Sequence, residues 1–272
     1  MNCSLCFSKC KKKNKLLYIC VKCKLVHFIK AKSFVYEKQY FEDEYKIQYG
    51  KTYIEDKANL QIRAKERLRK FKENINYAPN MALLEIGSAA GFFLEKAKDE
   101  GFSVEGWEIS KKMAQVANKN GIKTKTGDWK SLYQKWNKEQ NKKYDILCAF
   151  YFLEHIEEQN LIWSLFKEMI KPGGFLMLAM PSIYGPSYYF EFNNWLKFHP
   201  KDHFVDYSPK TLKNAAKLFS FNVIMTSYEG IHPERFPLGK NIVLSKIYQF
   251  IQKKMKFSDT MFTILKKEER HD

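Results

Sequence analysis

From Met81 onward, short apolar runs alternate with amphipathic stretches, an order that few folds accommodate. The segments MALLEI and SVEGWEI have the composition of strands, and FFLEKAKDEGF and KKMAQVANKN have that of the helices that follow them. The runs KYDILCAFYF and FLMLAMP are continuously apolar, which is typical of parallel strands that are buried on both faces. Strands and helices in this order predict an α/β fold with a doubly wound, mostly parallel sheet.

The remaining pattern adds three helices and two strands. We expect helices at 157–170, where Lys171-Pro172-Gly173-Gly174 forms the stop, at 209–219 and at 240–256, and strands at FNVIMTSYE and DTMFTILK. Residues 182–208 are aromatic without a clear period, so we expect a loop that acts as a lid or substrate wall. Four of its aromatic residues could contact a flat or sugar-like acceptor, although such residues are also typical of a core: Tyr184, Tyr188, Tyr189 and Trp195.

Composition divides the chain into three parts. Residues 1–33 are rich in cysteine and lysine, residues 34–76 form an aromatic and charged connector that turns helical, and residues 77–272 form the α/β domain. In the connector, five residues are spaced for one buried stripe of a helix: Leu60, Ala64, Arg67, Leu68 and Phe71.

The first 23 residues contain two CxxC pairs, Cys3/Cys6 and Cys20/Cys23, separated by thirteen residues. Pairs at this spacing predict a structural zinc site in which four thiolates saturate a tetrahedral ion. Free thiols or a redox pair are the alternative. Cys10 and His27 could replace a ligand, and Cys148 is expected in the core because it lies in a buried strand.

The strand MALLEI ends in the glycine-containing turn Gly87-Ser88-Ala89-Ala90-Gly91, and a helix follows. Such a turn lets backbone N–H groups approach a ligand at the carboxyl edge of the sheet. Glu108 ends the next strand 21 residues after Gly87, which is the offset at which an acid meets ribose hydroxyls. A nicotinamide dehydrogenase is a competing reading, but the turn lacks the G-x-G-x-x-G register of a pyrophosphate site.

The stretch LLEIGSAAGFFLEKAKDEGFSVEGWEIS, followed by Gly127-Asp128-Trp129, YDILCAFYFLEHIEE and the KPGG turn, resembles class I S-adenosylmethionine-dependent methyltransferases. The resemblance implies a Rossmann-like sheet of seven strands, and Ala89 departs from it because the family more often has glycine there. It implies that Glu85 and the turn hold the methionine part, Glu108 the ribose, and Ile109, Asp128 and Trp129 the adenine. By the same resemblance, the cofactor site comprises Glu85, Gly87, Ser88, Ala89, Gly91, Phe92, Glu108, Ile109, Asp128, Trp129, Phe150 and Tyr151.

Methyl transfer from a sulfonium needs a positioned nucleophile, and it needs a base only when the acceptor is protonated. His155, beside Glu154 after the KYDILCAFYF strand, is the candidate base, while helix capping or pocket shaping is the other interpretation of this pair. His199 and His203 are second choices.

The N-terminal part resembles the zinc ribbons that precede methyltransferase domains, some of which act on ribosomal RNA and some on nucleotide-linked sugars. We therefore predict a methyltransferase acting on a small molecule or saccharide intermediate, with a ribosomal or transfer RNA methyltransferase as the alternative.

The formal net charge is +17, and residues 1–33 contain nine lysines and no acid. Such a field attracts polyanions, although a lysine-rich surface can also serve solvation alone. A non-catalytic adaptor for nucleic acid or a membrane surface, using the basic helix 241–256, is the third interpretation, although packing of that helix on the sheet is the favoured interpretation of its pattern. The sequence has no apolar run of about 18 residues and no signal-peptide core at its start, so we expect a cytoplasmic protein.

Overall fold

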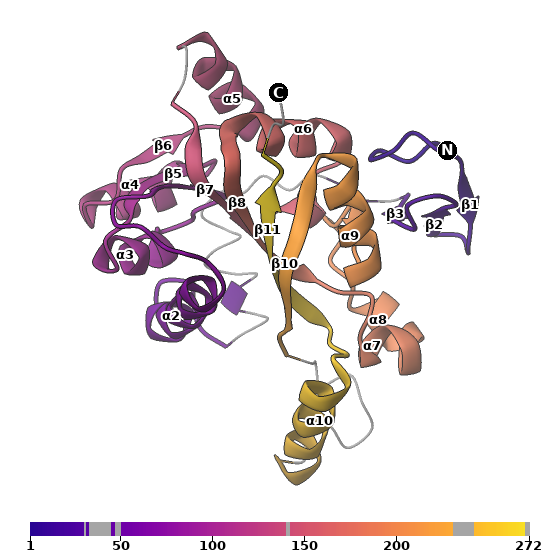
Figure 1. Cartoon of the computed structure of the whole chain (residues 1–272). Coiled ribbons are helices and arrows are strands. Elements are labelled where there is room, and N and C mark those ends of the chain that lie inside the picture. Colours follow the sequence, from indigo (N-terminus) through magenta and orange to yellow (C-terminus); the bar gives the residue numbers. More distant parts are fainter. Residues whose placement is uncertain (30, 33–44, 47–49, 140–141, 231–241, 270–272) are drawn as a thin grey trace. The chain divides into compact units, whose positions relative to one another are not determined.

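The computed structural model describes residues 1–29, 31–32, 45–46, 50–139, 142–230 and 242–269 (Figure 1). The chain divides into two compact units. Unit 1 contains residues 1–33, 151–167 and 178–268, and unit 2 contains residues 34–150, 168–177 and 269–272. The three consecutive domains expected from composition stay a prediction.

Seven strands form a sheet in the order β10-β11-β8-β7-β4-β5-β6, which confirms the predicted Rossmann-like α/β class. The pairs β4/β5, β4/β7 and β5/β6 are parallel, and β10/β11 is antiparallel. The strands are β4 (Ala82–Ile86), β5 (Ser103–Glu108), β6 (Thr124–Thr126), β7 (Tyr144–Phe150), β8 (Ile170–Pro181), β10 (Phe221–Tyr228) and β11 (Thr260–Lys267).

In unit 2, helix α3 (Phe92–Asp99) packs against β5, and α4 (Lys111–Lys119) packs against β5 and β6 (Figure 1). Helix α2 (Lys57–Asn74) packs against α3. The expected stripe of α2 is buried at Ala64, Arg67, Leu68 and Phe71. Strand β4 is buried along its whole length, as a central parallel strand should be. The sequence did not predict β6 or α5 (Trp129–Lys138), because β6 is a three-residue strand with one buried residue.

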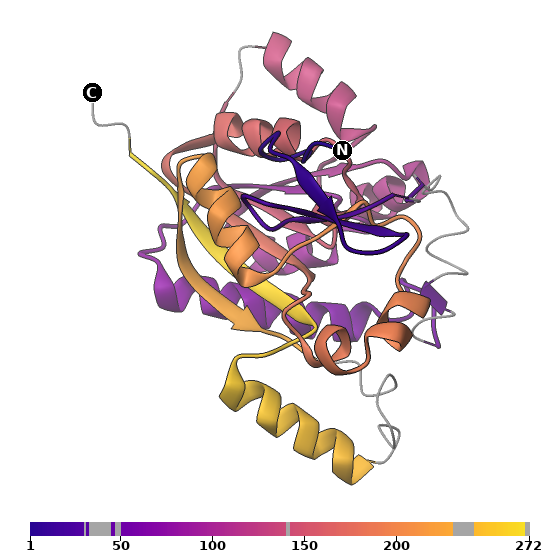
Figure 2. The same ribbon diagram turned by 90° about the vertical axis from the view of Figure 1, so that its right-hand side faces the viewer.

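In unit 1, a second sheet has the order β1-β2-β3-β9 (Figure 2). Its strands are β1 (Cys10–Lys12), β2 (Leu17–Cys20), β3 (Val26–Phe28) and β9 (Val205–Asp206). All three pairs are antiparallel, and His27 lies opposite Val205. The N-terminal segment therefore obtains its fourth strand from a much later part of the chain.

The aromatic segment after β8 is more ordered than the expected loop. It forms α7 (Pro186–Phe190), where Pro186 occupies the first turn, and α8 (Phe192–Lys197). Trp195 is buried in one cluster with Leu17 and Val26, and Tyr188 packs against that cluster. These two side chains therefore belong to the core beneath β2 and β3, whereas Tyr184 and Tyr189 are exposed.

The last part of unit 1 contains α9 (Pro209–Leu218), which lies along β10, and α10 (Ile242–Met255), which projects beyond the ends of β10 and β11 (Figures 1 and 2). The side chains of Val243, Ile247 and Phe250 on α10 are exposed, so this face is not packed on the sheet. Within the described part of the chain, no helix is both long and apolar enough to span a bilayer.

Candidate functional site

The turn between β4 and α3 is held under the end of β5. The N–H groups of Gly87 and Ser88 both donate to the Trp107 carbonyl, at 2.8 and 3.1 Å. Gly87 and Gly91 have φ of +76° and +75°, and Ala89 has φ of +46°. The alanine that departs from the family pattern thus adopts the left-handed conformation that favours glycine. The turn accepts this strain because its backbone is bonded on both sides.

Glu108 lies next to this turn, as its spacing predicted. One carboxylate oxygen accepts a 2.8 Å hydrogen bond from the Ala89 N–H, and the other accepts one of 2.7 Å from the Ser110 N–H. Glu108 is buried, and burial raises its pKa, although these backbone N–H groups oppose the shift. Each oxygen keeps a further lone pair, so the carboxylate can still accept from a diol.

Gly106 on β5 is a site residue that the sequence reasoning missed. A Cβ atom there would lie 2.6 Å from the Ser88 hydroxyl and 2.8 Å from the Thr124 hydroxyl. Glycine therefore permits the turn to approach β5 closely. The signal in the sequence is a single glycine inside a strand, which marks close approach without naming the partner.

Two buried polar atoms, one just before this turn and one within it, have no hydrogen-bond partner among the described residues. They are Oε2 of Glu85, at the end of β4, and the hydroxyl of Ser88. Burial raises the pKa of Glu85 well above its usual value of 4.5, and the positive charge of Arg67 opposes the shift. The unsatisfied atoms mark a place for a polar ligand, since buried polar groups are nearly always bonded.

Arg67 of α2 is buried, and its guanidinium lies 4.5 Å from the centre of the Phe150 ring. The sequence reasoning counted Arg67 only as a member of a buried stripe. The positive charge of Arg67 opposes the rise in the pKa of Glu85. A cation therefore interacts with the carboxyl group that lies at the end of β4, just before the turn. Phe150 also contacts Phe93 edge-on at 4.8 Å, and Phe92 stacks on Tyr53 at 5.5 Å.

The residues expected around an adenine follow β5 and β6. Asp128 caps α5, accepting hydrogen bonds from both the N–H and the hydroxyl of Ser131, and these bonds lower its pKa. The Gly127 N–H donates to the Glu108 carbonyl at 3.0 Å, which ties this cap to the end of β5. Ile109 is half exposed and Trp129 is half-buried. Apolar surface and a hydrogen-bond acceptor thus occur together, as a purine requires.

These residues fit a nucleoside carrying an amino-acid tail. Glu108 offers the diol acceptor, Ile109 and Trp129 offer apolar surface, and the unsatisfied Glu85 oxygen offers an acceptor for an ammonium group. Of the residues expected here, eleven lie in unit 2, and Tyr151 lies in unit 1, where its N–H donates to the Ala179 carbonyl at 2.7 Å.

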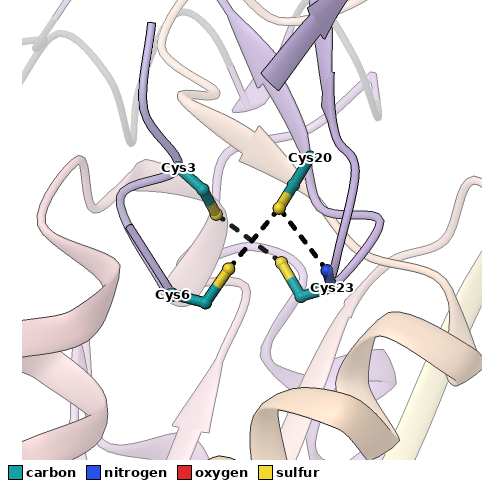
Figure 3. Close-up of side chains that lie close together, drawn as sticks. All are labelled: Cys3, Cys6, Cys20 and Cys23. Carbon is teal, nitrogen blue, oxygen red and sulfur yellow. Dashed lines mark hydrogen bonds between the residues drawn. The ribbon is translucent and has the colours of Figure 1, made fainter. Parts of the chain in front are cut away.

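The four expected cysteine ligands come together in unit 1 (Figure 3). The Sγ atoms of Cys3 and Cys23 are 3.5 Å apart, and those of Cys6 and Cys20 are 3.4 Å apart. Zinc–thiolate bonds of about 2.3 Å place tetrahedral sulfurs about 3.8 Å apart. The cluster is therefore close to the size that one ion needs.

Both cysteine turns have the same local geometry. Phe7 and Lys24, each directly after a CxxC pair, have φ of 58° and 68°. Their N–H groups donate back to the carbonyls of Cys3 and Cys20. Asn160 of α6 (Gln159–Met169) fixes the first turn, because its N–H and its side-chain amide donate to the carbonyls of Ser4 and Leu5.

Neighbouring thiols perturb one another in this cluster. The hydrogen bond with Cys23 lowers the pKa of Cys3 to about 3, and the same contact raises the pKa of Cys23. Nε2 of His27 lies 3.4 Å from the Cys3 sulfur, and Cys3, Cys10 and His27 are also close enough to one another to hold an ion, so the replacement of a ligand by Cys10 or His27 stays a prediction. Burial raises the pKa of Cys10 to about 12, and Cys148 is fully buried, as predicted.

Glu154 and His155 lie in unit 1, in a short 3-10 helix, Leu153–His155. Nδ1 of His155 lies 3.0 Å from a carboxylate oxygen of Asp202. Burial disfavours the His155 cation, but Asp202 and Glu154 outweigh it and raise the pKa. Burial raises the pKa of Glu154 to about 7. A histidine held by a carboxylate through Nδ1 keeps Nε2 for proton transfer.

The comparisons with known proteins agree with this geometry. A family model described as a methyltransferase domain matches residues 60–226, more than half of the chain. The chain belongs to the class I S-adenosylmethionine-dependent methyltransferases. The predicted enzyme class is confirmed, and the non-catalytic adaptor is not retained.

The methyltransferase is similar to a ubiquinone biosynthesis O-methyltransferase of Pelagibacter ubique, with 26% identity over 60% of this chain and 79% of that protein. In fold, it is similar to an S-adenosylmethionine-dependent methyltransferase of Archaeoglobus fulgidus, with a TM-score of 0.57 and 18% identity over 82% and 98% of the two chains. A magnesium protoporphyrin IX methyltransferase of Synechocystis, solved with bound S-adenosylhomocysteine, gives a TM-score of 0.55 and 14% identity over 85% and 97%.

Proposed function

We propose that this methyltransferase transfers the methyl group of S-adenosylmethionine to a hydroxyl group of a small molecule, a class that includes a saccharide intermediate. Hydroxyl acceptors are favoured by the similarity to enzymes named ubiquinone biosynthesis O-methyltransferase. The observation that carries the proposal is the pair Glu108 and Ala89, which joins the turn after β4 to the acid that ends β5.

Cofactor binding is assigned to residues of unit 2. Glu108 accepts from the ribose hydroxyls, and Asp128 accepts from the adenine amino group between Ile109 and Trp129. The unsatisfied Oε2 of Glu85 accepts a hydrogen bond from the ammonium group of the methionine part. Arg67, whose charge acts on Glu85, supplies a positive charge for the carboxylate of the methionine part. Gly87, Ser88 and Gly91 of the turn, Phe92 at the start of α3 and Phe150 at the end of β7 shape the cofactor site.

The cofactor supplies an activated methyl group on a sulfonium, so the protein has to orient the acceptor and remove its proton. We assign the proton to Nε2 of His155, because Asp202 holds the ring through Nδ1. Glu154 supports the cation that forms, since its charge raises the pKa of His155. A hydroxyl acceptor needs such a base, whereas an amine can react in its neutral form.

The four-cysteine cluster is proposed to hold one structural zinc ion. Cys3, Cys6, Cys20 and Cys23 supply four sulfurs at the right separation, and four thiolates leave no position for a substrate. For the alternative, methylation of RNA, the supporting observation is the basic composition of residues 1–33.

The proposal is tested by incubating the full chain with methyl-labelled cofactor and an extract of small molecules, lipids and RNA. We expect label in small molecules, in a methyl ether. Label in RNA, or on nitrogen or carbon, would contradict the assignment. His155→Gln should lower turnover at least about 100-fold while cofactor binding is unchanged. Glu157→Gln, an exposed neighbour, is the matched control.

A further inference from the structure

Unit 1 contains further side chains that could hold a metal ion, in addition to the cysteines. One such group consists of His199, His203 and Asp206, in the segment from the end of α8 through β9, and the proposed function assigns these residues no role. One ligand atom from each residue lies within 4.8 Å of the other two. The side chains are 8%, 8% and 2% exposed, so all three are removed from solvent.

The carboxylate of Asp206 lies between the two imidazole rings. Its Oδ2 is 2.9 Å from Nε2 of His199, and its Oδ1 is 3.6 Å from Nδ1 of His203. The second distance is too long for a hydrogen bond. Accordingly, Nδ1 of His203 and Oδ1 of Asp206 have no hydrogen-bond partner within the described part of the chain. Two buried polar atoms therefore lie 3.6 Å apart, and neither makes a hydrogen bond within that part of the chain.

The surrounding elements fix these side chains. His199 stacks on Phe28 of β3 with ring centres 3.9 Å apart, and Asp206 lies opposite Val26 in the β3/β9 pair. Two carboxylates lie beside the group: Asp202 is bonded to His155, and Glu154, which has one buried oxygen without a hydrogen-bond partner among the residues described, lies within ligand reach of His155 and His203. His155 meets His203 edge-on at 4.8 Å. The three ligand residues are thus held by packing and by backbone pairing, which is how a metal site is preorganised.

We propose that His199, His203 and Asp206 bind a second divalent ion of the zinc type. Zinc takes imidazole nitrogen and carboxylate oxygen at about 2.0–2.1 Å, which places tetrahedral ligand atoms about 3.3 Å apart. The 3.6 Å separation of His203 Nδ1 and Asp206 Oδ1 is close to this value, and Nε2 of His199 lies 2.9 Å from the other oxygen of the same carboxylate. The ion displaces the proton shared by His199 and Asp206, and it satisfies both unpartnered atoms. Three protein ligands leave a fourth position for water.

The site is tested by metal analysis of the full-length protein after dialysis against zinc. We expect about two zinc ions per chain, and about one in both Asp206→Asn and His203→Gln. Asp202→Asn is the matched control, because it removes a carboxylate four residues away that is bonded to His155, and it should retain both ions.

Cobalt substitution keeps the test independent of folding. Cobalt in the cysteine cluster gives intense sulfur-to-metal charge-transfer absorption, whereas a nitrogen and oxygen site gives only weak visible bands. Asp206→Asn should lose the weak bands and keep the sulfur bands, which shows that the ribbon is still folded. A wild-type protein that holds one ion only, or an Asp206→Asn variant that keeps the full metal content, overturns the proposal.

Discussion

The N–H of Ala89 donates a 2.8 Å hydrogen bond to the carboxylate of Glu108, joining two residues whose positions in the sequence had predicted one ligand site. This bond fixes the orientation of the carboxylate before any ligand arrives. It also explains why Ala89 is kept at φ of +46°, because its N–H must point toward β5. The turn and the acid therefore act as one preorganised element.

Glu108→Gln is expected to weaken binding of S-adenosylmethionine about 10- to 100-fold, because hydrogen bonds to a charged acceptor contribute about 1.5–3 kcal/mol. Isothermal titration calorimetry measures the change. Glu105→Gln on the same strand is the control, because Glu105 pairs with surface lysines. Equal affinity of Glu108→Gln and the wild type would remove the ribose assignment.

Two substitutions in the turn should differ in their effect on the stability of the folded protein. Gly91→Ala is expected to destabilise the protein by about 1–2 kcal/mol, the usual penalty of the left-handed conformation. The new Cβ would also lie 3.1 Å from that of Ala117. Ala89→Gly relieves strain but adds chain entropy, so its effect should stay within about 1 kcal/mol. Chemical denaturation of both variants measures this, and the reverse order would contradict the described turn.

The raised pKa of Glu85 predicts a pH-dependent stability. Above the usual pKa of 4.5, the folded protein retains a proton that the unfolded chain releases. Its stability therefore declines as pH rises, by at most about 1.4 kcal/mol per pH unit. Glu85→Gln lacks this dependence. The unfolding free energy of the variant should therefore rise relative to that of the wild type between about pH 5 and 8. A constant difference over this range would show that Glu85 is not perturbed.

Removal of one zinc ligand should destabilise unit 1. Cys20→Ser is expected to lose about one zinc ion and several kcal/mol of stability, because binding of a structural zinc is coupled to folding. Metal analysis and thermal denaturation measure both effects. Cys10→Ser should behave like the wild type, since Cys10 lies outside the group of four. If a chelator leaves the melting temperature of the wild type unchanged, the ribbon holds no structural ion.

Much of the alternating framework could be read from the sequence, because buried parallel strands and amphipathic helices carry strong periodic signals. The expected helix at 209–219 corresponds to α9 at Pro209–Leu218. The structure of the aromatic segment, residues 182–208, was harder to predict. Helix α7 is short, and the N–H and hydroxyl of Ser187 are both held by Asp259, far along the chain. Order that depends on such a distant partner leaves no local pattern.

In the candidate site, too, residues with a local sequence pattern could be predicted, and residues that depend on distant partners could not. Glu108 could be predicted because its distance from Gly87 follows from one strand, one helix and a second strand. Gly106 could not, since its importance comes from Ser88 and Thr124, which only the folded chain brings within reach. Arg67 looked like a buried stripe residue, and its charge matters only because Glu85 is buried near it.

The pairing of β3 with β9 has a consequence for how the protein is made. The ribosome releases the N-terminal cysteines early, but the strand that completes their sheet is synthesised only when residues 205 and 206 emerge. Until then the outer edge of β3 displays unpaired backbone groups, which invite association with other chains. A fragment ending before β9, or the first 33 residues grafted onto another protein, would keep that exposed edge permanently.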